Sequence, residues 1–255
     1  MSEIPPYTVI IPARYDSRRL PGKPLAVIAG KPMIWHVYQR ARESHAERIV
    51  IATDDERIRV VAEDFGASVI MTRHDHESGT DRLAEAVIQL GLDEQEIVVN
   101  LQGDEPLMPP RLLDQVALSL HSRQDASVAS LMTPIKSVQE FQDPACVKVV
   151  CDARGYALYF SRASIPVLRD GLAEAIASLA MRHLGVYAYR CQFLREFASM
   201  PPCELEQLEK LEQLRVLYYG RKIIMDVALE TPPVGVDTPD DLHRVSKLLT
   251  GEKND

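Results

Sequence analysis

A short loop near the start of the sequence gathers several positively charged side chains. It follows the apolar run Thr8–Ile11 and contains Arg14, Arg18, Arg19 and Lys23. A loop that follows a buried parallel strand lies at the edge of the sheet where α/β proteins bind their ligands. Guanidinium and ammonium groups gathered there suit a polyphosphate, because its oxygens accept charge-assisted hydrogen bonds. A solvated basic loop without a ligand is the alternative.

This loop does not match the common phosphate-binding motifs. Neither Gly-x-x-x-x-Gly-Lys-Ser/Thr nor Gly-x-Gly-x-x-Gly follows the strand. The sequence therefore disfavours standard ATPases and nicotinamide dehydrogenases. It favours a nucleotide site built from Arg and Lys side chains on a turn.

Carboxylates follow two other strand candidates. Asp104 and Glu105 come after the apolar segment Ile97–Leu101 and a glycine turn, and Asp237 comes after Gly235. Mg²⁺ binds one or two protein carboxylates and completes its octahedron with water and phosphate oxygens. Carboxylates that face a basic loop therefore predict a Mg²⁺-dependent phosphate site. For each of these segments, capping of the following helix is the alternative.

The segment His76–Arg82 places Gly79 and small polar residues at the start of a helix candidate. A glycine turn of this kind can bring backbone groups close to a base or a ribose. Helix capping explains the same residues equally well.

Strand and helix candidates alternate through the first half of the chain. This alternation predicts a parallel sheet with right-handed crossovers, and the continuous apolar runs suit strands that are buried on both faces. The expected helices and the strands that follow them are Met33–Glu43 with Ile49–Ala52, Ile58–Phe65 with Ser68–Met71, and Arg82–Leu90 with Ile97–Leu101.

The pattern changes near Asp143, where strand candidates follow one another with fewer helices, which indicates mixed or antiparallel pairing. Leucines at every third position predict one helix over Leu205–Tyr218. The segment Pro166–Met181 is expected to be a loop or a short helix. The other expected elements are the strands Val147–Val150, Tyr156–Phe160, Gly185–Tyr189 and Ile223–Val227, and the helix Pro239–Leu249, preceded by the capping candidates Asp237 and Thr238.

Composition narrows the class of protein. The chain has 255 residues, 46% of them hydrophobic, and a formal net charge of −8, which disfavours general attraction to nucleic acid or to an anionic membrane. The sequence contains no apolar run of about eighteen residues and no secretory signal pattern. Its four cysteines lack metal-ligand spacing. We therefore expect a cytoplasmic protein that acts on small molecules, without nucleic-acid or membrane partners.

Together these segments resemble the sugar nucleotidyltransferases that make CMP-sugars, and within that family the enzymes that use 3-deoxy-manno-octulosonate (Kdo). The opening loop and Gln102–Pro106 occur loosely throughout the family, whereas their combination with Phe160–Arg162, Arg182–Tyr187 and Leu211–Arg215 is specific to the Kdo enzymes. The resemblance runs from about Val9 to Leu242 and is carried by Ile11–Leu25, Ala52–Asp54, His76–Arg82, Val99–Pro106, Tyr156–Pro166, Arg182–Tyr189, Leu211–Val216 and Gly235–Pro239.

The resemblance implies a Rossmann-like nucleotidyltransferase α/β fold. In that fold a mostly parallel sheet is flanked by helices, and a lobe with a mixed sheet binds the acceptor and forms a homodimer. The chain would be a single domain over 1–255, with a nucleotide part over about 7–142, an acceptor and dimerisation part over about 143–230, and a metal-ligand segment with a helix over about 231–250.

The resemblance also implies a role for individual residues. The catalytic set would be Arg14, Lys23, Asp104 and Asp237, with Asp104 and Asp237 as the Mg²⁺ ligands. Arg18 departs from the family pattern and receives no role. The nucleotide would contact Arg14, Arg19, Lys23, Ser78, Gly79, Thr80 and Gln102. The Kdo pocket would contain Arg162, His183, Tyr187, Glu212 and Gln213.

The implied reaction transfers CMP from CTP to Kdo, giving CMP-Kdo and pyrophosphate for lipopolysaccharide biosynthesis. Related acceptors stay open, namely 8-amino-Kdo, sialic acid or a sugar 1-phosphate, and so does a non-catalytic nucleotide-sensing module. The residues alone also allow structural roles, with Tyr187 as a buried strand aromatic, His183 as a structural histidine and Glu212 as a surface residue.

Overall fold

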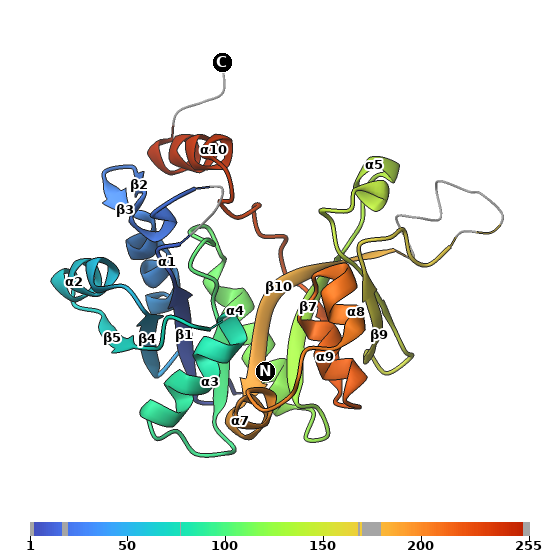
Figure 1. Cartoon of the computed structure of the whole chain (residues 1–255). Helices are drawn as coiled ribbons and strands as arrows, with labels where there is room; N and C mark the ends of the chain where they lie inside the picture. Colours follow the sequence, from blue (N-terminus) through green and yellow to red (C-terminus); the bar gives the residue numbers. More distant parts are fainter. Residues whose placement is uncertain (1–2, 17–19, 77, 168, 170–179, 252–255) are drawn as a thin grey trace.

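The computed structural model describes residues 3–16, 20–76, 78–167, 169 and 180–251. Within these residues nine strands form one twisted sheet, which helices cover on both faces (Figure 1). The order along the main path of the sheet is β11-β7-β10-β6-β1-β4-β5. The predicted fold class, a mainly parallel sheet with a mixed second part, is confirmed.

The first half forms the parallel part of the sheet, with β1 paired to β4 on one side and to β6 on the other. Its strands are β1 (Tyr7–Ala13), β4 (Arg48–Thr53), β5 (Ser68–Met71) and β6 (Ile97–Asn100). The helices that follow or connect them are α1 (Met33–Arg42), α2 (Glu56–Asp64), α3 (Gly79–Gln89) and α4 (Pro110–His121). A short 3-10 turn η1 (Lys23–Leu25) and the hairpin β2 (Val27–Ile28) and β3 (Lys31–Pro32) lie between β1 and α1.

The second half adds the mixed part of the sheet. The long strand β10 (Met181–Arg190) is antiparallel to β6 and to β7 (Val128–Pro134), and β11 (Ile223–Val227) is parallel to β7. The strands β8 (Lys148–Cys151) and β9 (Ala157–Ser161) form an antiparallel pair beside β10. The helices of this half include α5 (Val138–Gln142), α7 (Cys191–Phe197) and α10 (Pro239–Thr250).

The single helix expected over Leu205–Tyr218 is wrong. Two helices, α8 (Glu204–Glu209) and α9 (Gln213–Tyr218), occupy this segment, and Lys210 between them has a left-handed backbone with φ of 53°. On an α-helix, each residue lies about 60° behind the residue three positions before it. Five leucines at this spacing therefore spread around the helix and cannot share one face. Accordingly, Leu208 is 81% exposed whereas Leu214 is buried.

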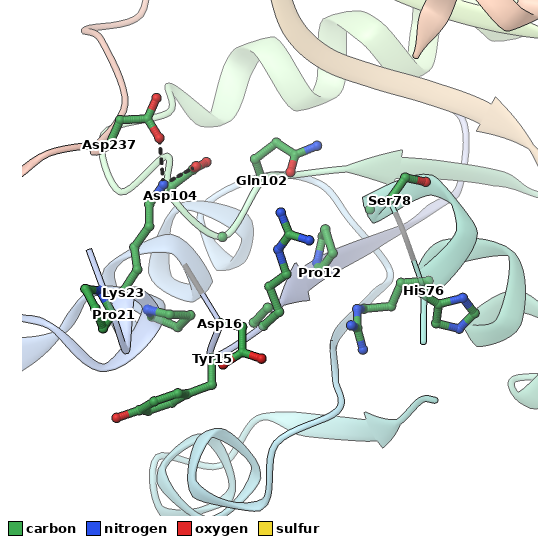
Figure 2. A pocket seen from close by; sticks show the side chains of 16 residues that line it. Pro12, Tyr15, Asp16, Pro21, Lys23, His76, Ser78, Gln102, Asp104 and Asp237 are labelled. Carbon is green, nitrogen blue, oxygen red and sulfur yellow. Dashed lines mark hydrogen bonds and ion pairs between the residues drawn. The ribbon is translucent and has the colours of Figure 1, made fainter. Parts of the chain in front are cut away.

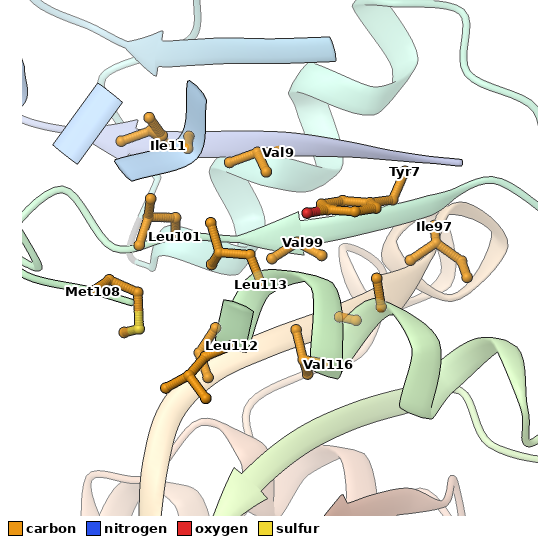
Figure 3. Packing of buried hydrophobic residues seen from close by; sticks show 14 of the residues in the cluster. Tyr7, Val9, Ile11, Ile97, Val99, Leu101, Met108, Leu112, Leu113 and Val116 are labelled. Atoms are coloured by element: carbon orange, nitrogen blue, oxygen red, sulfur yellow. The ribbon is translucent and has the colours of Figure 1, made fainter. Parts of the chain in front are cut away.

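The main core lies between the sheet and α4 (Figure 3). Val9 and Ile11 of β1 and Val99 of β6 pack in one cluster with Leu113 and Val116 of α4, and all five side chains are fully buried. Strands buried on both faces read as continuous apolar runs, which is the pattern of this sequence. The core therefore fixes the ends of β1 and β6, from which the basic loop and the carboxylate turn emerge. Among the described residues no helix is both long enough and apolar enough to cross a bilayer.

Candidate active site

A cavity of about 960 Å³ opens at the carboxyl ends of β1 and β6 (Figure 2). Its walls include seven of the side chains or glycines that the sequence singled out, namely Arg14, Lys23, Ser78, Gly79, Gln102, Asp104 and Asp237. The cavity lies at the sheet edge predicted for the ligand. Arg18 and Arg19 lie outside the described residues.

The turn after β6 packs directly on the end of β1. A Cβ atom at Gly103 would lie 2.7 Å from the carbonyl oxygen of Pro12, closer than real side-chain contacts allow. Glycine at this position therefore permits the approach that places Gln102 and Asp104 on the cavity wall. The capping alternative is wrong for this turn, because α4 begins after Pro109 without any side-chain cap.

The basic loop is held by contacts around Gly22. This glycine has a φ of 67°, and its N–H donates to the carbonyl oxygen of Tyr15 at 3.1 Å. The guanidinium carbon of Arg57 lies 3.3 Å from the centroid of the Tyr15 ring. This stacking holds the Tyr15 ring against Gly22, where a Cβ atom would lie 3.1 Å from the ring.

Lys23 joins the two carboxylates that were predicted to bind metal. Its Nζ lies 2.6 Å from Asp104 Oδ2 and 2.9 Å from Asp237 Oδ1 (Figure 2). A cation between two carboxylates from distant segments is the arrangement that a divalent ion would need. Among the described residues no group of three or more His, Cys, Asp or Glu side chains could hold a metal. An ion bound by this pair would therefore take its other ligands from water and substrate oxygens.

A third carboxyl group, Glu105, lies beside this pair. Burial, together with the negative charges of Asp104 and Asp237, raises the pKa of Glu105 to about 8. The segment that carries Asp237 docks on the same turn, because the N–H of Val236 donates to the Asp104 carbonyl oxygen at 2.9 Å. A Cβ at Gly235 would lie 2.9 Å from Glu105 Oε1 and 3.0 Å from the main-chain oxygen of Asp104, so a side chain there would push the two segments apart.

The His76–Arg82 segment combines capping with cavity lining. The Ser78 hydroxyl caps α3 by accepting from the N–H of Asp81, which confirms the capping alternative for that residue. Thr80 points elsewhere, and its hydroxyl donates to Glu212 Oε2 at 2.6 Å. His76 and Arg82 also line the cavity, although neither was predicted as a site residue. Both residues belong to the segment His76–Arg82, which the sequence had singled out as a whole.

The predicted Kdo pocket is only partly assembled. Tyr187, Glu212 and Gln213 share a small cleft with Thr80. The His183 ring lies 5.3 Å from the Tyr187 ring, and its Nε2 is 2.9 Å from Ser130 Oγ. Burial lowers the pKa of His183 to about 3, so its imidazole is neutral.

Arg162 is held by main-chain oxygens. Its guanidinium donates to the carbonyl oxygens of Pro144 at 2.9 Å and Glu209 at 2.8 Å. The buried ammonium of Lys148 donates in turn to the carbonyl oxygens of Asp143, Cys146 and Arg162. A further cavity of about 180 Å³ is lined by Asp104, His183 and Asp237, and Arg162 lines neither this cavity nor the two above.

Comparison with known proteins shows the family to which this chain belongs. The family model described as cytidylyltransferase matches residues 8–223. The chain is 55% identical to a 3-deoxy-manno-octulosonate cytidylyltransferase of Pseudomonas fluorescens, an alignment that covers 95% of this chain and 98% of the relative. The corresponding protein of Pasteurella multocida is 51% identical, over 95% of this chain and 98% of its own length.

Solved structures agree with the sequence relatives. A CMP:2-keto-3-deoxy-manno-octonic acid synthetase complexed with CTP superposes with a TM-score of 0.89 at 42% identity, covering 97% of this chain and all of the other. A 4-diphosphocytidyl-2C-methyl-D-erythritol synthase has a TM-score of 0.63 at 14% identity and covers 98% of this chain and all of its own, which shows a shared fold alone.

Proposed function

Because this chain belongs to the 3-deoxy-manno-octulosonate cytidylyltransferase family, we propose that it transfers CMP from CTP to Kdo, giving CMP-Kdo and pyrophosphate. The observation that carries the proposal is this family membership over nearly the whole chain. The cavity supports it, since its lining combines the cations Arg14 and Lys23 with the paired carboxylates Asp104 and Asp237. A triphosphate that binds together with a divalent cation needs positive groups for its oxygens and carboxylates for the cation.

The reaction is an in-line displacement at the α-phosphorus of CTP. An oxygen of Kdo, its anomeric hydroxyl, forms the new P–O bond, the bond to the β-phosphate oxygen breaks, and the hydroxyl proton passes to solvent. Arg14 and Lys23 hold the phosphates, and Gln102 lies beside the nucleotide. Catalysis then rests on positioning and on charge neutralisation rather than on covalent chemistry of the protein.

Mg²⁺ is the cofactor we propose for this site. Asp104 and Asp237 would hold it, and their fit rests on the ammonium that now lies between them at 2.6 and 2.9 Å. When bound, the ion would neutralise phosphate charge and lower the pKa of the acceptor hydroxyl. The chain then needs no dedicated base, and the neutral His183 is not required as one.

The acceptor would lie between the carboxylate pair and the cleft formed by Tyr187, Glu212 and Gln213. Their hydroxyl, carboxylate and amide groups suit the several hydroxyls of a sugar acid. Purified protein with CTP, Kdo and MgCl₂ should release pyrophosphate only when Kdo is present. Sialic acid and 8-amino-Kdo serve as comparison acceptors. Absence of Kdo-dependent pyrophosphate, with the protein folded, would refute the proposed function.

Arg162→Ala is expected to raise the KM for Kdo by about tenfold, the cost of losing one charged hydrogen-bond donor, and to leave the KM for CTP unchanged. For Arg162 to meet the Kdo carboxylate, its guanidinium must leave the carbonyl oxygens of Pro144 and Glu209. Steady-state kinetics with each substrate varied in turn measures both constants. Arg154→Ala, at an exposed arginine on the turn before β9, is the matched control. A rise in the KM for CTP alone would move the acceptor pocket away from Arg162.

We also propose that the protein is a homodimer that works in the cytoplasm and supplies lipopolysaccharide assembly. Apolar side chains at the surface of the second half support a dimer, since Leu158 of β9 is 62% exposed and Leu208 of α8 is 81% exposed. Light scattering at micromolar concentration should give twice the 28.6 kDa mass of the chain. Leu208→Glu should lower that mass, whereas Leu248→Glu on α10 should not. A monomeric wild-type protein would contradict the dimer.

A further inference from the structure

One side-chain hydrogen bond joins the nucleotide turn to the acceptor cleft. Thr80 lies on the first turn of α3, two residues after Ser78, and its hydroxyl donates to Oε2 of Glu212 at 2.6 Å. Glu212 immediately precedes α9, in the other half of the chain. Thr80 is 2% exposed and belongs to the cleft of Tyr187, Glu212 and Gln213 rather than to the lining of the large cavity.

The second carboxylate oxygen of Glu212 has no such partner. Within the part of the chain that the structure describes, Glu212 Oε1 is buried and meets no hydrogen-bond donor. Burial raises the pKa of Glu212, although the Thr80 hydroxyl stabilises its charge. A buried oxygen without a donor is costly in a folded protein. It therefore indicates a donor from outside the chain at this position, and the adjoining cleft of about 10 Å³ has room for a single hydroxyl or water.

We propose that Thr80 is a positioning residue for the acceptor: its hydroxyl fixes Oε2 of Glu212, so that Oε1 points to a hydroxyl of the sugar acid. This inference rests on the proposed function for the identity of the acceptor. It changes the role of Thr80, which the sequence placed among the nucleotide contacts. Because Thr80 and Ser78 share the first turn of α3, the same bond links the acceptor cleft to the wall of the nucleotide cavity.

The test deletes the hydroxyl and keeps the shape of the side chain. Thr80→Val should raise the KM for Kdo by about tenfold, because the carboxylate loses the donor that orients it, and should leave the KM for CTP within about twofold. Thr80→Ser should restore the wild-type KM for Kdo. Thr8→Val removes another buried threonine hydroxyl, near the opposite end of β1, and is the matched control, expected to behave as wild type.

A double variant separates positioning from general loss of structure. In the Glu212→Ala background, Thr80→Val should raise the KM for Kdo by no more than about twofold further, because the group that Thr80 positions is gone. Additive effects would overturn the inference. So would a Thr80→Val variant in which only the KM for CTP rises, or in which neither constant changes. The comparison requires that the wild-type protein releases pyrophosphate only when Kdo is present. If it does not, the proposed function is refuted and not this inference.

Discussion

Asp104→Asn and Asp237→Asn are each expected to reduce turnover by about 10²-fold or more, since each removes a hard anionic ligand of Mg²⁺ and transition-state charge loses several kcal/mol of stabilisation. The two carboxylates come from segments far apart in the sequence, yet one ammonium contacts both. Turnover at saturating CTP and Kdo across a MgCl₂ titration measures the effect.

The residues at the start of α10 show that Asp237 can be changed without removing the helix cap. Thr238 caps the helix, and Asp241 accepts from the N–H groups of Thr238 and Asp237, so the Asp237 carboxylate is not the cap. Asp237→Asn should therefore keep the thermal unfolding midpoint of the wild type. Asp240→Asn, an exposed carboxylate on the first turn of the same helix, is the matched control. Wild-type turnover in Asp237→Asn would exclude that residue as a metal ligand.

Lys23→Ala should raise the KM for CTP by about 10- to 100-fold, because a charged hydrogen bond to the triphosphate is lost. The structure adds a second expectation. Without the ammonium, Asp104 and Asp237 lose the Lys23 cation that contacts both of them, beside the buried carboxyl group of Glu105. The variant should therefore unfold at a lower temperature than wild type in EDTA, and MgCl₂ should recover much of the difference.

Lys136→Ala, at an exposed lysine outside the cavity, is the control for the Lys23 variant and should match wild type in both measurements. Equal KM values for CTP in Lys23→Ala and wild type would remove Lys23 from the triphosphate site. Equal unfolding temperatures in EDTA would show that the carboxylates do not depend on its charge.

The parallel half could be predicted because its residues repeat one simple pattern. Apolar runs such as Ser68–Met71 became strands with the expected bounds, and the polar residues after β1 and β6 reached one cavity because parallel strands end at one edge. The strand β7 was not predicted. It follows the polar turn Ser122–Ser127, and in its short apolar run periodicity alone does not separate a buried strand from a buried helix.

Contacts between side chains and distant main-chain groups could not be predicted. The guanidinium of Arg162 is bound by carbonyl oxygens of Pro144 and Glu209, and nothing in the pattern around Arg162 indicates them. The pairing of Thr80 with Glu212 spans two halves of the chain that the sequence treats as separate sites. Such contacts depend on how the elements pack, which local spacing does not encode. The break at Lys210 is different, because the helical geometry of the leucine spacing already disfavours one helix.

The strand β10 limits how this molecule can close around its substrates. Its backbone bonds to β6 on one side and to β7 on the other, and the ladder with β7 has an irregularity between Leu184 and Tyr187. A hinge that swung one half of the chain against the other would have to break that ladder, at a cost of about 1 kcal/mol for each bond. A continuous ladder, not a single connecting segment, therefore joins the two halves. Closure that keeps this ladder intact would involve segments beside the cavity and not a swing of one half against the other.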